Sequence, residues 1–194
     1  MSVAFYKARS PDVDSAMAEW NGQGSFLPDS CTASETTRHL TEQDHTQLIV
    51  RLGRVGANCD VMFTWYYDLM VTPKALRAFE AAKLTGFEVR PVVISDHKRS
   101  KHIKELWELW PHRSFLPISP RSGRTVLKRC EACRCPVEVS GAYDPLRVVD
   151  AKDWDGRDMF RVEAYGGILV SQRFVDTVKS ADLWGFKFTQ LVAE

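Results

Sequence analysis

The feature that most constrains this fold is a strand-helix-strand pattern that occurs twice, over 65–92 and over 164–191. In each copy an apolar strand runs into a helix-capping residue, an amphipathic helix follows, and a glycine precedes a second strand. The identical residues of the two copies are Tyr66/Tyr165, Val71/Val170, Ala82/Ala181, Leu84/Leu183, Gly86/Gly185 and Phe87/Phe186. We therefore predict an internal repeat, while two unrelated segments that follow the same local rules stay open as the alternative.

The first copy contains the best-specified helix of the chain. Thr72 is a natural N-cap, and Pro73 suits the first helical position because its backbone angle is already helical. An apolar stripe at helical spacing begins at Leu76. We expect Gly86 to end this helix as a C-terminal glycine, and Ser171 to cap the helix of the second copy.

Outside the two copies the local signals are weaker. Turn residues dominate 7–46, which predicts an irregular arm with one short helix near 14–20. Apolar and aromatic runs predict strands at 48–50 and 61–67. The expected fold class is α+β, with two similar strand-helix-strand units packed as one globular protein.

Length and composition limit the domain organisation. The chain has 194 residues, of which 44% are hydrophobic, and it can therefore bury a substantial core. We expect a single domain over 1–194. It would contain pseudo-repeats at about 47–94 and 136–194, joined by a basic connector at 95–135.

Charge and hydropathy exclude several environments. Lys and Arg total 26 against 25 acidic residues, so the chain as a whole has no pull toward nucleic acid or anionic membranes. No apolar stretch approaches the roughly 18 residues that a membrane helix needs, and the N-terminus does not resemble a signal peptide. We expect a cytoplasmic protein whose five cysteines are reduced.

The connector is the one strongly basic region of the sequence. Its run 98–104 leads into 106–110, where leucines and tryptophans predict a short helix with an aromatic face. Basic side chains can contact phosphates and tryptophans can stack on bases, which keeps nucleic-acid binding open. The more ordinary interpretation is a solvated helix whose tryptophans lie in the core.

Cys130 and Cys133 form the sharpest chemical signature. Two thiols three positions apart on a turn can both bind one Zn²⁺, but they fill only half of its tetrahedron. The candidates for the remaining ligands are Cys31, Cys135, His39 and Cys59. A structural thiol cluster stays open as the alternative, and a redox pair would need a strand-to-helix context that this basic, proline-flanked segment does not suggest.

The acidic run 150–158 resembles part of a calcium-binding loop. Aligning Gly156 with the invariant glycine of that loop places Ala151 and Val162 at ligand positions, where carboxylates are required. The run is therefore predicted as an acidic surface turn. The sequence also lacks a phosphate-binding glycine loop and a nucleophile elbow, so we expect that this protein is not an enzyme.

The C-terminal part of the chain resembles a known family. Its segments 158–161, 168–175 and 183–188 are similar to those of the double-CxxCG motif proteins of myxobacteria and their relatives. The order of motifs in that family extends the similarity over most of the chain. The family is associated with immunity to polymorphic toxins.

The two Cys pairs of that family are retained unequally here. The second pair matches Cys130 and Cys133, whereas Arg134 stands where a glycine is expected. The first pair is reduced to Cys31 and Ser34. Zinc is the one cofactor that the sequence suggests, with Cys130, Cys133, Cys31 and Cys135 as its candidate ligands, although these departures from the family pattern argue against a complete site.

The resemblance implies a cytoplasmic immunity protein that acts in bacterial competition by binding and neutralising a cognate toxin, with no turnover of its own. Residue type and loop placement suggest the contact residues, which are Trp107, Trp154, Trp184, Asp153, Asp155 and Asp158, with Trp20 as a further aromatic candidate. The alternative function is a nucleic-acid-binding protein that contains a zinc knuckle.

Overall fold

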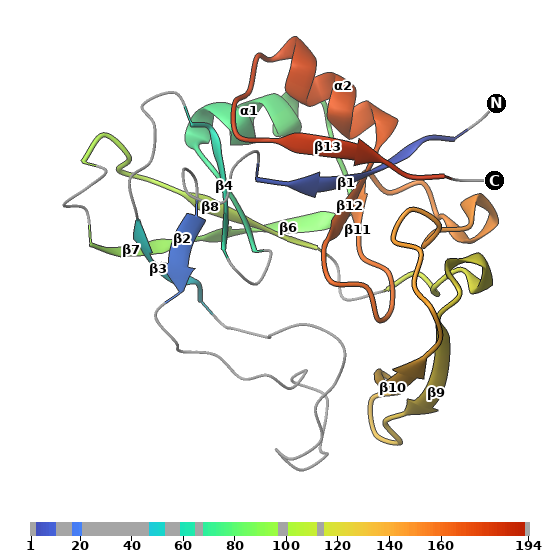
Figure 1. The fold of residues 1–194 in the computed structure, drawn as a ribbon. Helices are drawn as coiled ribbons and strands as arrows, with labels where there is room; N and C mark the ends of the chain where they lie inside the picture. The colour runs from blue at the N-terminus through green and yellow to red at the C-terminus, as the bar shows by residue number, and fades with distance from the viewer. Residues whose placement is uncertain are drawn as a thin grey trace.

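The computed structural model describes residues 3–10, 17–20, 47–52, 59–64, 68–96, 101–111 and 115–192. This part of the chain is α+β, as the sequence predicts. Two helices lie against a seven-stranded sheet and a four-stranded sheet, and a two-stranded hairpin extends from the body (Figure 1). Among these residues, no helix is both long and apolar enough to cross a membrane.

The seven-stranded sheet has the order β6-β8-β5-β4-β2-β3-β7. Its strands are β2 (Met17–Trp20), β3 (Ile49–Leu52), β4 (Val61–Thr64), β5 (Leu69–Val71), β6 (Phe87–Pro91), β7 (Val93–Asp96) and β8 (Trp107–Pro111). β2 runs parallel to β4 and β3 runs parallel to β7, whereas the other pairs are antiparallel. The strands predicted near 48–50 and 61–67 are present as β3 and β4, although 65–67 lie outside the described residues.

The four-stranded sheet is antiparallel throughout and has the order β11-β12-β1-β13. Its strands are β1 (Phe5–Arg9), β11 (Met159–Phe160), β12 (Ile168–Ser171) and β13 (Lys187–Gln190). In the larger sheet, the four neighbouring strands β4-β5-β8-β6 are also antiparallel, and their order can be matched strand for strand with β11-β12-β1-β13.

Two expectations for the N-terminal segment are wrong where the structure describes it. The irregular arm predicted at 7–46 begins inside β1, a central strand with Phe5 and Ala8 fully buried. The helix predicted near 14–20 is strand β2 over Met17–Trp20. Both strands pair with segments that follow much later in the chain, so turn residues nearby in sequence do not reveal them.

The two helices begin where the sequence predicts. They are α1 (Pro73–Ala81), which starts directly after Thr72, and α2 (Gln172–Ser180), which starts directly after Ser171. The Ser171 hydroxyl accepts a hydrogen bond from the backbone N–H of Phe174 at 3.2 Å, as an N-cap should. Thr72 accepts no such bond, and its hydroxyl donates to Asp60 at 3.4 Å.

The end of α1 differs from the prediction. The helix stops at Ala81, and the chain turns at Lys83, which has a φ of 52°. Gly86 has a φ of 96° and lies so close to β11 that a Cβ atom there would overlap the carbonyl oxygen of Met159. Gly86 is therefore required for close packing rather than for ending the helix.

The segment 106–110 is also different from its prediction, because it forms most of strand β8 instead of a helix. β8 lies between β5 and β6, where Leu109 and Trp110 are buried. A short apolar run fits helical and strand spacing almost equally well, and here the two neighbouring strands decide the conformation.

One hydrophobic cluster takes side chains from both larger sheets and both helices. The rings of Phe79 in α1 and Phe174 in α2 are 4.9 Å apart, and both side chains are fully buried. Since truncating such a ring to alanine costs about 3–5 kcal/mol, this contact is a major part of the interface between the helices.

Candidate functional site

Asp60 joins the start of α1 to the segment that follows α2. It is 7% exposed and accepts hydrogen bonds from the hydroxyl of Thr72 at 3.4 Å and the ammonium of Lys74 at 3.0 Å. Its carboxylate also accepts the backbone N–H of Trp184 at 3.0 Å. Lys74 donates in addition to the carbonyl oxygen of Asp182 at 3.0 Å. These charge-assisted bonds hold the backbone of Trp184 against α1.

Asp158 makes the corresponding contacts at the start of α2. It is 2% exposed and accepts hydrogen bonds from Ser171 at 2.8 Å and Arg173 at 3.0 Å. The backbone N–H of Thr85, in the segment that follows α1, donates to it at 3.0 Å. Arg173 also reaches the carbonyl oxygen of Lys83 at 3.1 Å. Each carboxylate thus ties its own helix to the chain that leaves the other helix.

The two sites differ in the residue that supplies the backbone N–H. At Asp158 that residue is Thr85, whose hydroxyl donates a further hydrogen bond to the carboxylate at 3.2 Å. At Asp60 it is Trp184, whose side chain is 66% exposed. Trp184 is therefore an aromatic side chain that projects from a firmly held backbone, and its indole is accessible from solvent.

A pocket of about 400 Å³ opens beside the start of α1. Residues 59–60, 72–74, 77 and 102–105 line it. Its basic side chains are Lys74, Arg77 and Lys104, with His102 beside them, and its acidic side chains are Asp60 and Glu105. The backbone N–H of Trp184 is bonded to Asp60, one of the residues that line the pocket, so the backbone of Trp184 lies close to this basic pocket.

The thiol of Cys59 also lines this pocket. It donates a hydrogen bond to the carbonyl oxygen of Val61 at 2.9 Å. Burial raises the pKa of the Cys59 thiol above its usual range, which favours the neutral form over the nucleophilic thiolate. Cys59 is therefore better suited to packing than to attack on a substrate.

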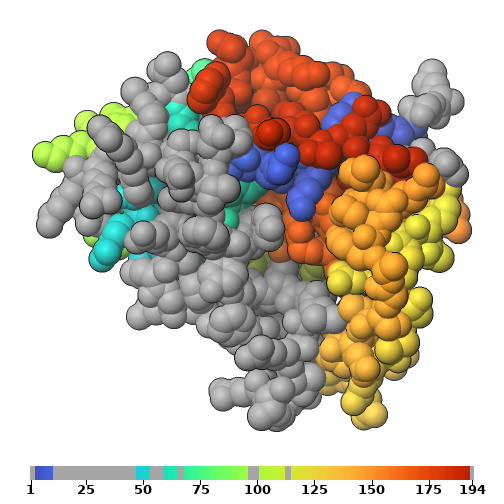
Figure 2. All heavy atoms as spheres, in the orientation of Figure 1, coloured from blue at the N-terminus to red at the C-terminus, as the bar shows by residue number. Residues whose placement is uncertain are grey.

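Cys130, Cys133 and Cys135 lie at the tip of the hairpin formed by β9 (Thr125–Arg129) and β10 (Pro136–Ser140), which extends from the lower right of the body (Figure 2). The backbone N–H of Cys130 donates to the carbonyl oxygen of Cys135 at 2.8 Å. Arg134 has a φ of 63°, a left-handed conformation that glycine adopts more easily. The turn thus has the backbone shape that a glycine would favour, although the sequence supplies arginine.

Cys130 and Cys133, the two predicted zinc ligands of the hairpin, both lie in the turn between β9 and β10. The described residues contain no group of three or more cysteine, histidine or acidic side chains that could hold a metal. Cys31 lies outside the described residues. Zinc binding therefore stays a prediction.

The acidic run 150–158 is mostly engaged in local structure. Asp150 accepts hydrogen bonds from Ser119 at 2.8 Å and Arg121 at 2.7 Å, and the Arg121 bond is the main reason that its pKa is lowered. Asp155 bonds Arg157 at 2.8 Å, which lowers the pKa of Asp155 in the same way.

Two other acidic residues were expected at a partner interface. Asp153 is partly buried in the short 3-10 helix Ala151–Asp153. Asp158, at 2% exposure, has almost no surface to offer a partner. Asp158 is therefore corrected from a contact residue to a structural one, because its carboxylate is needed at the start of α2.

The tryptophans expected to be exposed also behave differently from one another. Trp107 is partly buried and packs against the main hydrophobic cluster, which corrects its assignment as an exposed contact. Trp154 is partly buried too, with its indole N–H donating to the carbonyl oxygen of Arg157 at 2.8 Å and its ring 5.2 Å from Phe5. Trp184 is the exposed member of these three. The side chain of Trp20 lies outside the description.

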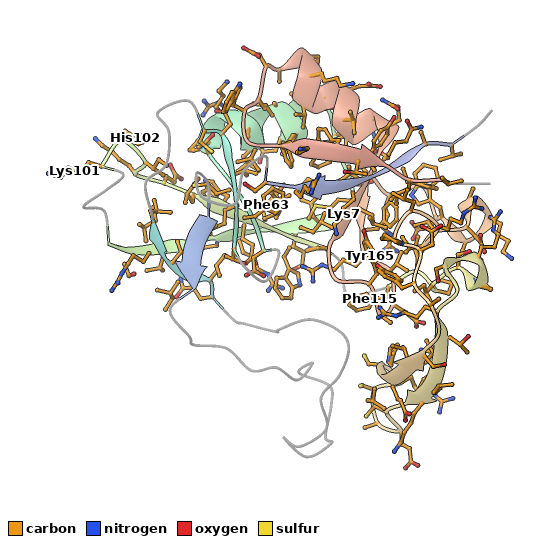
Figure 3. The ribbon with its side chains drawn as sticks, in the orientation of Figure 1. Lys7, Phe63, Lys101, His102, Phe115 and Tyr165 are labelled. Atoms are coloured by element: carbon orange, nitrogen blue, oxygen red, sulfur yellow. The ribbon has the colours of Figure 1, made fainter. Side chains whose placement is uncertain are left out.

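The basic connector does not form one continuous surface in the described residues. Lys101 and His102 lie at the left edge of the molecule, whereas Phe115 lies on the right-hand side near Tyr165, because β8 crosses between them (Figure 3). Beyond that crossing, Arg121 pairs with Asp150 and Arg129 pairs with Glu163, each at 2.7 Å. Charges that are adjacent in sequence are thus separated or neutralised.

The sequence reasoning did not single out Asp60, Lys74 or Arg77. A signal for the first two is nevertheless present, since Asp60 and Asp158 precede corresponding strands and Lys74 and Arg173 follow corresponding caps. Arg77 has no comparable signal, because its importance comes from the pocket that α1 and residues 102–105 form together.

Comparison with known proteins adds no assignment to this geometry. No family model matches the chain, and no curated protein matches its sequence.

Proposed function

We propose that this chain is a cytoplasmic immunity protein that binds a cognate toxin of a polymorphic toxin system and neutralises it by protein-protein contact. The observation that carries the proposal is the side chain of Trp184, which is 66% exposed although its backbone is fixed by Asp60. Tryptophan on a rigid support is a favoured anchor in protein interfaces, since it buries a large area at a small entropic cost. The similarity of 183–188 to the double-CxxCG family supports a toxin as the partner.

We also propose that the scaffold consists of two copies of one unit. The matching contacts of Asp60 and Asp158 support this, as does the shared order of antiparallel strands. In the first copy, β8 lies between β5 and β6, the strands before and after α1. In the second copy, β1 lies in the corresponding place between β12 and β13, the strands before and after α2. On this proposal, the first strand of the chain completes the second copy.

Binding without turnover agrees with how the buried polar groups are used. Asp60 and Asp158 accept hydrogen bonds that join the two helices, and burial raises the pKa of the Cys59 thiol, which disfavours the nucleophilic thiolate. A specific interface would bury roughly 1,200–2,000 Å² in total and depend on a few anchor residues. Trp184 is the first such anchor that we propose.

The test is co-expression of this chain with the product of the adjacent toxin-like gene. We expect growth to be rescued and the two proteins to co-purify. Trp184→Ala should weaken the complex by about thirtyfold or more, because anchor residues contribute about 2 kcal/mol or more. The matched control is Leu127→Ala, which removes another exposed apolar side chain, 56% exposed, from the hairpin. A toxin that remains lethal beside well-expressed wild-type protein would exclude the immunity function.

A further inference from the structure

We propose that the basic pocket beside α1 receives an acidic segment of the protein partner, with Trp184 packing at its rim. This inference rests on the proposed function for the identity of the partner, but its chemistry can be tested alone. It identifies the kind of surface that the partner presents: exposed Asp or Glu side chains on a loop or chain end.

The charges of the pocket support an acidic occupant. Lys74 is held by Asp60 at 3.0 Å, which leaves Arg77 and Lys104 opposite the single remaining carboxylate, Glu105. Within the described part of the chain, neither Arg77 nor Lys104 has a recorded ion pair, and both side chains are exposed. In the sequence, 102–105 also continues the basic run that begins at Lys98.

The position of Arg77 favours a carboxylate in particular. It lies one helical turn after Lys74, so both side chains emerge on the same side of α1 beside the pocket. Its planar guanidinium can donate two parallel hydrogen bonds to one carboxylate. Arginine and tryptophan are both enriched among the residues that contribute most to protein interfaces.

The corresponding place on α2 has opposite chemistry. There Asp176 stands where α1 has Arg77, and it accepts a hydrogen bond from Gln172 at 2.8 Å. Thr85 stands where the other site has Trp184. The carboxylates that join the helices are present at both places, so packing of the helices does not require Arg77 or the indole of Trp184. These two residues are therefore available for binding.

An acidic protein segment fits better than nucleic acid. Binding to a nucleic acid backbone depends on several phosphate contacts along a continuous basic tract. The connector does not supply such a tract here, since β8 separates Lys101 and Lys104 from Arg121 and Arg129 in the chain, and both arginines are paired with acidic residues. A pocket of about 400 Å³ instead suits a compact group of side chains.

The direct test uses purified full-length protein and a short poly-glutamate peptide, titrated by calorimetry at low salt. We expect saturable binding that weakens as salt is added. The double variant R77A/K104A should lose about tenfold or more in affinity, since it removes two charge-assisted contacts. Lys128→Ala, which removes an exposed cation from β9, should bind as the wild type does.

Three outcomes would overturn the inference: no binding of the peptide at low salt, equal affinity of the double variant, or tighter binding of a single-stranded oligothymidine at the same pocket. The co-expression assay separates this inference from the proposed function. If Arg77→Glu with Lys104→Glu leaves toxin rescue intact while Trp184→Ala abolishes it, the immunity function stands and the acidic segment is excluded. If the wild type fails to rescue but R77A/K104A loses the peptide, the pocket stands and the immunity function falls.

Discussion

The carboxylate of Asp60 accepts a hydrogen bond at 3.0 Å from the backbone N–H of Trp184, a residue 124 positions later in the chain. Asp158 receives the backbone N–H of Thr85 at the same distance across 73 positions. The starts of both helices are therefore fixed to segments that follow the other helix. These reciprocal hydrogen bonds fix the backbone of Trp184, and their consequences for stability and binding can be measured.

Replacing the buried carboxylates should destabilise the protein. Asp158→Asn weakens the hydrogen bonds from Ser171, Arg173 and Thr85, and we expect a loss of about 2–3 kcal/mol in the free energy of unfolding. Urea denaturation followed by circular dichroism measures this loss. The control is Asp176→Asn on the exposed side of α2, which should change stability by less than about 0.5 kcal/mol. Equal midpoints for both variants would contradict a structural role for Asp158.

Alanine at Gly86 should cost more than alanine at Gly156. Both glycines have positive φ, 96° and 90°, so both substitutions introduce backbone strain of about 1–2 kcal/mol. At Gly86 the new Cβ would also overlap the carbonyl oxygen of Met159, whereas at Gly156 nothing lies within 4 Å of it. Thermal unfolding should therefore give a clearly lower Tm for Gly86→Ala. Similar Tm values for the two variants would mean that the contact between Gly86 and β11 is looser than described.

The hairpin turn should be stabilised by glycine at position 134. Arg134 has a φ of 63°, so Arg134→Gly relieves the strain of a left-handed backbone conformation. We expect the hairpin to gain about 0.5–1 kcal/mol in local stability, which would be measured as slower amide hydrogen exchange in β9 and β10. Ala132→Gly is the matched change in the same turn at a residue without positive φ, and it should have the opposite sign. Two changes of the same sign would contradict this explanation.

Acid should remove the stabilisation that Asp150 provides. The hydrogen bond from Arg121 lowers the pKa of Asp150 below its unfolded value of about 3.9. The contribution is therefore complete above that value and is lost as the pH falls through the lowered native pKa. Between neutral pH and about pH 3, the Tm of the wild type should fall further than the Tm of Arg121→Leu, because the pKa of Asp150 is lowered less in that variant. Parallel pH profiles for the two proteins would contradict the pairing.

Zinc content can be measured independently of the partner. We propose that Cys130 and Cys133 supply two of the ligands, and expect about one equivalent of zinc in protein purified without chelator. Cys133→Ser should lose the metal, whereas Cys59→Ser should retain it because Cys59 lies at the distant pocket beside α1. If elemental analysis finds no zinc in the wild-type protein, the three thiols form a structural cluster only.

Helix starts and the turn of the cysteine pair follow from neighbouring residues, which is why sequence reasoning could find them. Pro73 directly after Thr72 places the first turn of α1, and Ser171 caps α2 with its own hydroxyl. The spacing of Cys130 and Cys133 likewise predicts a turn that the structure contains.

Burial and exposure were predicted less well. The sequence places both Asp158 and Trp184 in loops and suggests both as contact residues. In the structure Asp158 is 2% exposed, whereas Trp184 is 66% exposed. Residue type alone gives no information about which donors will surround a carboxylate after folding. The pocket that includes Arg77 could not be inferred either, because its walls come from segments that are not adjacent in sequence.

The sequence by itself determined where the two helices start, which of their faces are apolar and which segment forms the cysteine-bearing turn, because short-range sterics and local hydrogen bonds control these features. Only the tertiary structure decided that β1 lies between β12 and β13, that 106–110 belongs to a strand and that the backbone of Trp184 is bonded to Asp60 in the lining of a pocket. Each of these features depends on backbone or side-chain pairing between distant parts of the chain, and the local sequence pattern does not predict such pairing.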